Sequence, residues 1–193
     1  MGKIKITKTT LQDALIVEPQ IFGDHRGFFT ESYSEADFKA AGIQHDFIQD
    51  NHSLSTQAGV IRGLHFQMGE SAQTKLVRVV TGALLDVIFD LRKGSPTYGK
   101  WESFILSEAN QRQLLVPRGF AHGFVTLTTN VNFLYKCDRY YDAKADAGIA
   151  FDDPTLAVDW PLDISKAILS EKDQNHPSFK EFEKENPFIY GEI

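Results

Sequence analysis

The stretch that decides the fold is KLVRVVTGALLDVIFDL, residues 75–91. Two short apolar segments, 75–80 and 83–91, stand on either side of Thr81-Gly82. Segments of this length that are rich in valine, isoleucine and leucine, and are separated by a glycine turn, are typical of strands in a β-hairpin. The stretch therefore predicts two β-strands with a tight turn between them.

Two carboxylates, Asp86 and Asp90, interrupt the second of these strands. Acidic side chains are almost never fully buried unless a partner neutralises them. We therefore expect both at the rim of the sheet or on a solvent-facing side.

Short strands are predicted on both sides of this stretch, whereas helices are few. Further strand segments, each bounded by turn residues, are 59–67, 101–107, 112–116, 121–128 and 131–138. A serine cap, an acid in the first turn and a glycine stop predict a helix over 34–42, and a second short helix is expected over 178–184. This pattern favours an all-β sandwich or jelly-roll barrel with a few short helices.

The length and organisation of the chain predict a single domain. An all-β fold of 193 residues commonly forms one domain. No internal repeat, low-complexity tract or long linker divides the chain. Residues 142–166 carry two prolines and a tryptophan, and we expect them to form an irregular but ordered strap.

Composition and charge exclude several classes of function. The net charge of −6 argues against a general nucleic-acid or membrane-surface binder, although a few local cations suffice for a small phosphorylated ligand. The single cysteine, Cys137, excludes an internal disulfide and a cysteine-rich zinc site, and we expect it to be a packing residue. Without an N-terminal signal segment or an apolar run of about 18 residues, the cytoplasm is the expected location.

His65 and Arg62 lie three residues apart in the predicted strand 59–67. Histidine can take or give a proton near neutral pH, and arginine binds phosphate through paired hydrogen bonds. Together they indicate proton transfer on an anionic substrate. A histidine alone on a strand is more often a hydrogen-bonded core residue, so this pair needs support from elsewhere in the chain.

A second motif gives that support. The segment PRGFAHGF, residues 117–124, has the Pro-x-Gly-x-x-His pattern and is similar to the second motif of cupin β-barrels. The first cupin motif carries His-x-His, whereas this chain has His65-Phe66-Gln67. His65, Gln67 and His122 make a poor ligand set for a divalent ion, so we expect a metal-free cupin-type jelly roll.

At this level of detail the chain resembles the dTDP-4-dehydrorhamnose 3,5-epimerase family, from about residue 15 to 173, with a tail over 174–193. The shared motifs are FGDHRGFF at 22–29, QDNHS at 49–53, RGLHFQ at 62–67, AQTKLVR at 72–78, DLR and SPTYG at 90–92 and 95–99, PRGFAHGF at 117–124, and LYK and YY at 134–136 and 140–141. Agreement over so many ordered segments is far more specific than any single motif.

The resemblance implies a cofactor-independent epimerisation at C3 and C5 of dTDP-4-dehydro-6-deoxy-D-glucose, in L-rhamnose precursor synthesis. It makes His65 the base and Asp173 the carboxylate that orients it. It makes Tyr135 the acid and Lys75 the cation that stabilises the oxygen on C4. The chain also lacks a glycine-rich dinucleotide fingerprint, which agrees with a reaction that transfers no hydride.

The resemblance also implies a substrate-binding set and a homodimer. The binding residues are Arg26, Phe29, Glu31, Gln49, Asp50, Asn51, Arg62, His122, Tyr141, Asp146 and Lys172. Arg62 is a natural diphosphate ligand, and Tyr141 matches a tyrosine that stacks on thymine. We expect an N-terminal strand to complete the partner's sheet, and Arg26 and Phe29 to reach the site across the dimer interface.

Two other functions stay open. One is a single-carbon epimerase of a related dTDP-4-keto sugar. The other is a non-catalytic cupin that binds a sugar nucleotide, although the four catalytic matches speak against it. Deuterium uptake from solvent at two carbons, one carbon or none would separate the three.

Overall fold

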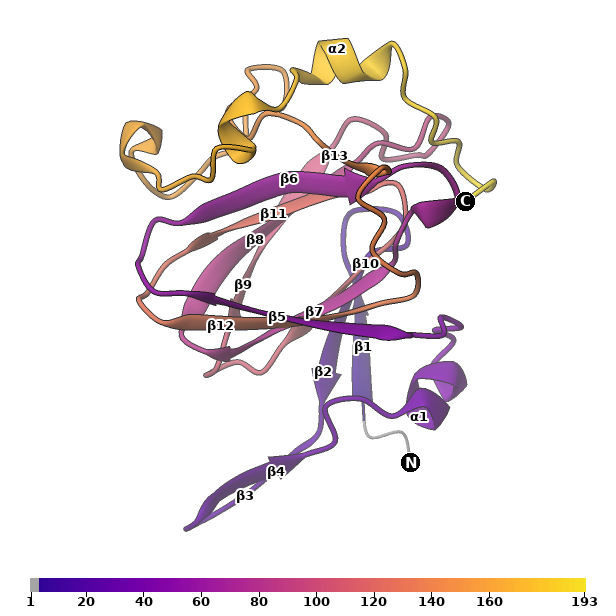
Figure 1. Ribbon diagram of the computed structural model, residues 1–193. Helices are drawn as coiled ribbons and strands as arrows, with labels where there is room; N and C mark the ends of the chain where they lie inside the picture. The colour runs from indigo at the N-terminus through magenta and orange to yellow at the C-terminus, as the bar shows by residue number, and fades with distance from the viewer. Residues whose placement is uncertain (1–3) are drawn as a thin grey trace.

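A computed structural model describes residues 4–193 as two antiparallel sheets packed face to face (Figure 1). The six-stranded sheet runs β1 (Ile4–Lys8), β2 (Leu15–Pro19), β10 (Gln113–Val116), β7 (Lys75–Thr81), β12 (Val131–Cys137) and β5 (Gln49–Ser55). The five-stranded sheet runs β13 (Asp146–Gly148), β6 (Ile61–Gln67), β11 (Phe120–Thr126), β8 (Ala83–Asp90) and β9 (Trp101–Ser107). The architecture is the predicted cupin-type jelly roll.

Short elements complete the fold. They are the hairpin of β3 (Ile21–Asp24) and β4 (Gly27–Thr30), the helices α1 (Glu35–Ala40) and α2 (Phe179–Glu183), and the 3₁₀ turns η1 (Gly69–Ser71), η2 (Ile164–Lys166) and η3 (Asp173–Asn175). Both predicted helices are confirmed, and each begins after a serine whose hydroxyl accepts from the backbone of the first turn. The predicted irregular strap over 142–166 does contain regular structure, namely β13 and η2.

The strands predicted around Gly82 are confirmed, but they do not form a hairpin. β7 pairs with β10 and β12 in one sheet, whereas β8 pairs with β11 and β9 in the other. Gly82, with φ +78°, therefore carries the chain from one sheet to the opposite sheet. Val79 of β7 and Ile88 of β8 pack in the same central cluster, so the two strands face each other instead of lying edge to edge.

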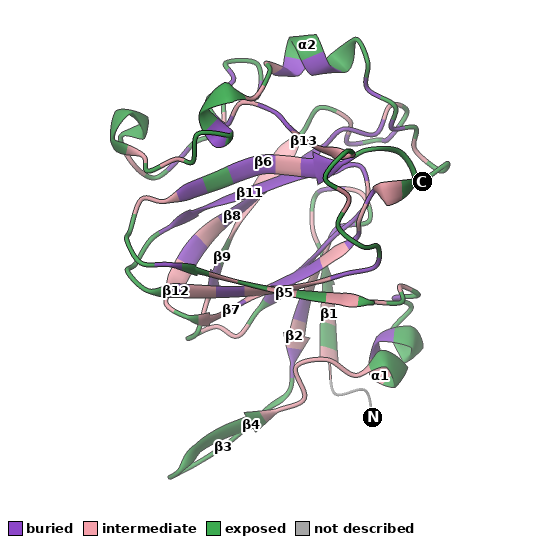
Figure 2. Ribbon diagram, in the orientation of Figure 1, coloured by how far each residue is buried: buried purple, intermediate pink, exposed green. Residues whose placement is uncertain are grey.

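The apolar core has one layer between the sheets and one on each outer face. Figure 2 shows buried stretches of ribbon on β6 and β11. Phe124 of β11 and Phe133 of β12 lie 4.7 Å apart between their ring centroids in the central layer. Phe38 of α1 packs on the outer face of the six-stranded sheet. No helix within residues 4–193 is long and apolar enough to span a membrane.

The C-terminal tail covers the outer face of the five-stranded sheet (Figure 1). Phe179, Phe182 and Phe188 are buried against β6 and β8 residues, and Phe182 lies 4.8 Å from the ring of Phe66. Each buried phenylalanine contributes roughly 2–3 kcal/mol of stability. This packing anchors the segment that contains η3, which lies against β6.

A β-bulge in β6 depends on two glycines. Gly63 has φ +126°, and a Cβ added there would lie 2.6 Å from the Cα of Gly123 and 2.9 Å from the carbonyl oxygen of His122. A Cβ added at Gly123 would lie 2.7 Å from the carbonyl oxygen of Arg62. Only glycines allow β6 and β11 to approach this closely.

The expectation that Asp86 and Asp90 are exposed is wrong, because both are completely buried. Both oxygens of Asp86 bond to Nε2 of His122, at 3.0 and 2.9 Å. Asp90 accepts hydrogen bonds from the guanidinium of Arg92 and from two hydroxyls. These partners compensate the loss of hydration, which is the condition under which a carboxylate can be buried.

Candidate active site

The bulge in β6 turns Arg62 and His65 toward the same side of the sheet. Residues three apart in a regular strand point to opposite faces. Here His65 pairs with His122 and Arg62 pairs with Phe124, so β6 carries one residue more than β11 between these pairs. Residues two apart on β11 share a face, and Phe124 is part of the central cluster. Both Arg62 and His65 therefore face the space between the sheets.

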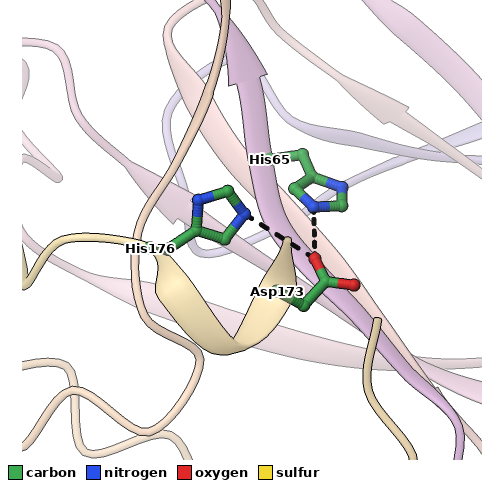
Figure 3. A group of neighbouring side chains, drawn as sticks. All are labelled: His65, Asp173 and His176. Carbon is green, nitrogen blue, oxygen red and sulfur yellow. Dashed lines mark hydrogen bonds and ion pairs between the residues drawn. The ribbon is translucent and has the colours of Figure 1, made fainter. Parts of the chain in front are cut away.

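His65 is hydrogen-bonded to Asp173, a residue 108 positions away in the chain (Figure 3). Nε2 of His65 lies 2.5 Å from Oδ1 of Asp173. Because a carboxylate can only accept, Nε2 carries the proton and Nδ1 keeps its lone pair. The His65 side chain is 31% exposed, so Nδ1 is left free to accept a proton. The predicted base and its orienting carboxylate are thus brought together.

Three groups donate to the Asp173 carboxylate, and the imidazole of His176 lies near it. Besides His65, the Gly63 amide lies 3.3 Å from Oδ1, the Ser170 hydroxyl donates to Oδ2 at 2.7 Å, and Nε2 of His176 lies 3.6 Å from Oδ1. Burial alone would raise the pKa of Asp173, but the groups around it lower that pKa well below its ordinary value. Asp173 is therefore ionised near neutral pH and can accept the hydrogen bond of His65.

The surroundings of His65 favour its neutral form. Burial lowers the pKa of His65, and the hydrogen bond and charge of Asp173 only partly oppose this effect. Lys75 and His176 lower the pKa of His65 further. A histidine that is unprotonated near neutral pH is suited to act as a base.

Lys75 and Tyr135 come from the opposite sheet and face the same interior. Tyr135 packs against the central cluster, with its ring 5.6 Å from that of Phe133. Nζ of Lys75 lies 6.0 Å from the centre of the Tyr135 ring. Burial raises the pKa of Tyr135, which keeps its hydroxyl protonated, and burial lowers the pKa of Lys75. The two side chains offer a neutral acid and an ammonium group.

His122 belongs to a second buried histidine–carboxylate pair, with Asp86. Burial raises the pKa of Asp86, while the charge of His122 and that of Lys75 act to lower it. The ring of His122 lies 6.2 Å from the Phe133 ring, so the His122–Asp86 pair lines the space between the two sheets. Asp86 holds His122 in one orientation.

A polar cluster lies beside this interior at β13. Oδ2 of Asp146 accepts from the hydroxyl of Tyr141 at 2.9 Å and from Nζ of Lys172 at 2.5 Å. The backbone amide of Tyr141 donates to the side chain of Gln49 at 3.0 Å, and Gln49 in turn donates to Asn51. The five residues connect β5, the strap and the segment before η3.

The three groups in Figure 3 could also be considered as metal ligands. Their ligand atoms, on His65, Asp173 and His176, are spread over up to 4.8 Å. A tetrahedral zinc ion with bonds of 2.0–2.1 Å requires ligand atoms about 3.3 Å apart. The Nε2–H of His65 is moreover already bonded to Asp173. The spacing fits a hydrogen-bonded pair with a neighbour better than a metal centre.

Comparison with known proteins agrees with this geometry. A family model for dTDP-4-dehydrorhamnose 3,5-epimerase matches residues 8–181. The chain belongs to this epimerase family.

Individual relatives match over nearly their whole length. The epimerase of Methanothermobacter thermautotrophicus is 46% identical over 94% of this chain and 97% of that protein. The crystal structure of the Bacillus anthracis enzyme with TDP and PPi bound has a TM-score of 0.88 and 51% identity, covering 91% of this chain and 99% of the other. The Legionella pneumophila enzyme in complex with dTDP-4-keto-L-rhamnose has a TM-score of 0.91 and 43% identity, covering 97% and 98%.

Several residues predicted from the epimerase resemblance lie away from this centre. Arg26 and Phe29 are exposed on the β3–β4 hairpin, which projects from the body of the molecule (Figure 1). Glu31 directly follows that hairpin. Asp50 alternates with Gln49 and Asn51 along β5, and it bonds to Lys136 instead, at 2.8 Å.

Three residues of the site were not predicted from the epimerase motifs. Asp86 was assigned to the rim, while Ser170 and His176 were given no role. The segment SEKDQNH, 170–176, contains no spacing that would reveal which side chains return to His65. Their roles depend on the tertiary position of η3 against β6.

Proposed function

We propose that this chain catalyses epimerisation at C3 and C5 of dTDP-4-dehydro-6-deoxy-D-glucose, giving dTDP-4-dehydro-L-rhamnose. The observation that carries the proposal is the His65–Asp173 pair facing Lys75 and Tyr135 across the two sheets. The family membership supports the same reaction. The Legionella relative is described with a 4-keto sugar nucleotide bound, which fits this substrate class.

In the first step, Nδ1 of His65 removes a proton from the carbon next to the C4 ketone. The electron pair of the broken C–H bond moves toward the C4 oxygen and forms an enolate. Asp173 stabilises the imidazolium that results, because its carboxylate accepts the Nε2–H. The ammonium group of Lys75 stabilises the negative charge that develops on the C4 oxygen.

In the second step, the hydroxyl of Tyr135 gives a proton to the same carbon from the other face. The enolate electrons form the new C–H bond, and the ketone is restored with the configuration inverted. His65 then loses its proton to solvent, and Tyr135 regains one. The raised pKa of Tyr135 agrees with a group that is protonated when the enolate forms.

We propose that the polar residues around the interior bind the nucleotide. Arg62 is exposed beside His65 and suits a diphosphate, because its guanidinium donates in a planar fork. Tyr141 is exposed and offers an aromatic face to the thymine. Lys172 and Asp146 lie next to Tyr141 and supply polar partners.

We also propose that the protein is a homodimer built through the β3–β4 hairpin. The hairpin exposes four apolar side chains, namely Ile21 (44%), Phe22 (47%), Phe28 (60%) and Phe29 (64%). An isolated two-stranded hairpin is marginally stable in water, so a second copy of the chain is the partner that would bury this surface. Arg26 and Phe29 would then reach the partner's site.

Residues 1–193 are proposed to act as one domain in the cytoplasm. The tail packs in the same apolar cluster as β6 and β8, which favours a single folding unit. Cys137 is a buried free thiol, in keeping with a reducing compartment.

The proposed function is tested by following the sugar configuration with NMR. The enzyme is incubated with dTDP-4-dehydro-6-deoxy-D-glucose, and the ring couplings of the product report the configuration at C3 and C5. We expect inversion at both carbons with the natural enzyme, and impaired inversion with Tyr135→Phe. Completed inversion by Tyr135→Phe at the normal rate would remove Tyr135 from its role.

A further inference from the structure

His176 is a buried imidazole that the proposed reaction does not use. Its side chain is 7% exposed, and its Nε2 finds no hydrogen-bond partner among residues 4–193. The nearest acceptor is Oδ1 of Asp173, 3.6 Å away, which is the oxygen that already accepts from His65. A buried polar nitrogen without a partner is unfavourable, so its orientation toward a carboxylate needs an explanation.

The position of the His176 ring is fixed from two sides. Its centroid lies 5.3 Å from that of His65, with the rings at 72° to each other. Figure 3 shows both rings next to the Asp173 carboxylate. On another side it lies against Gly148 of β13, where an added Cβ would come within 2.4 Å of Cε1 and 2.6 Å of Nε2. The glycine leaves the space that the ring occupies. This packing directs Nε2 toward Asp173.

Charged and titratable groups from β6, β13, η3 and the segments beside η3 and α2 surround His176. His65 lies on β6 and Asp173 on η3, and both contact it directly. Four others line a surface groove with it: Asp146 of β13, Glu171 and Lys172 before η3, and Glu185 after α2. Asp146 is already paired with Lys172. Asp173 is therefore the acceptor that its buried nitrogen faces.

We propose that His176 is a positioning residue for the His65–Asp173 pair: its Nε2–H donates to Oδ1 of Asp173, so that two imidazoles share one carboxylate oxygen. The inference rests on the proposed function, in which His65 is the base. A movement of about half an ångström brings the 3.6 Å contact into the ordinary range of a hydrogen bond. A carboxylate favours the tautomer that points N–H toward it.

Sharing Asp173 has a consequence for His65. A carboxylate that accepts from a second donor attracts the His65 proton less strongly, so the neutral base persists to lower pH. The nearby His176 also acts electrostatically to lower the pKa of His65, in the same direction. Removing His176 should therefore make His65 more basic, and the enzyme should lose activity at a higher pH.

The test combines three variants with two measurements. His176→Phe removes the donor and keeps a ring of similar size, whereas His176→Gln keeps an N–H within reach of Asp173. Gly148→Ala keeps the histidine at position 176 but displaces its ring. Because φ of Gly148 is not positive, the alanine itself adds no backbone strain. The midpoint of His65 is followed by NMR of ¹⁵N-labelled histidine, and the acid limb of kcat/KM is measured in parallel.

In His176→Phe and Gly148→Ala we expect the titration midpoint of His65 and the midpoint of the acid limb to rise by about 0.5 to 1 pH unit. A shift of this size corresponds to the loss of part of a charge-assisted hydrogen bond. His176→Gln should restore values near those of the natural protein. Superimposable titrations of His65 in all four proteins would overturn the proposal, as would His176→Gln behaving like His176→Phe. Because NMR reports His65 without turnover, these results stay distinct from a failure of the proposed reaction.

Discussion

Gly63→Ala should damage both the stability and the active site. At this position φ is +126°, which costs an alanine about 1–3 kcal/mol. The new Cβ would also lie 2.6 Å from the Cα of Gly123 and 2.9 Å from the carbonyl oxygen of His122. Neither backbone atom can move as a flexible side chain would, and overpacking of this kind costs about 1–3 kcal/mol. Together the two effects predict a loss of about 2–6 kcal/mol in the free energy of unfolding.

The assay for Gly63→Ala is urea unfolding followed by circular dichroism, with two matched controls. Gly27→Ala has a closely similar φ of +133° but nothing within 4 Å of the added Cβ, so it isolates the backbone cost. Gly123→Ala has no positive φ and isolates the steric cost, because its Cβ would lie 2.7 Å from the Arg62 carbonyl oxygen. A Gly63→Ala protein as stable as Gly27→Ala would refute the close approach of β6 and β11.

Three further predictions concern the two histidine–carboxylate pairs. Asp173→Asn removes the carboxylate that fixes the tautomer of His65. In a steady-state assay kcat should fall by about 10²- to 10⁴-fold, while the circular dichroism spectrum stays the same. A fall in kcat of less than threefold would contradict the orienting role of Asp173. The acid limb of the pH profile of kcat/KM should have its midpoint below about pH 6.5. Burial lowers the pKa of His65, so the neutral base is lost only as the pH falls through that lowered pKa. A midpoint above about pH 7 would contradict His65 as the base. Asp86→Ala leaves the buried His122 without its hydrogen-bond partner. The free energy of unfolding, measured with urea, should fall by about 1–3 kcal/mol. An unchanged urea midpoint would show that the pair is dispensable for stability.

The local sequence predicts most strands correctly because a strand is a local pattern. The segments 75–80, 83–91, 101–107 and 131–138 are confirmed to within a residue or two. Pairing is a tertiary property, and a glycine turn between two strands did not reveal that Gly82 connects opposite sheets. β2, β3, β4, β5 and β13 were missed. For β5 and β13 the reason is that neither QDNHSLS nor DAG shows the apolar alternation of a typical strand.

The site could be predicted only where long motifs supplied it. His65 and Asp173 lie 108 residues apart, and no periodicity connects them. Asp86 was placed at the rim because its compensating partner, His122, is 36 residues away on another strand. His176 was missed for the same reason: its burial depends on Gly148 and the packing of the tail. Partners distant in sequence decide which polar groups can be buried.

Deuterium uptake from solvent is the most direct test of His65 as the base. The protein and its His65→Ala variant are incubated with dTDP-4-dehydro-6-deoxy-D-glucose in D₂O, and the label in the sugar is located by mass spectrometry and NMR. We expect deuterium at both C3 and C5 with the natural protein and at neither carbon with His65→Ala. Label at one carbon only would indicate a single-carbon epimerase. No label with the natural protein, or full labelling by His65→Ala, would contradict the assignment of His65 as the base.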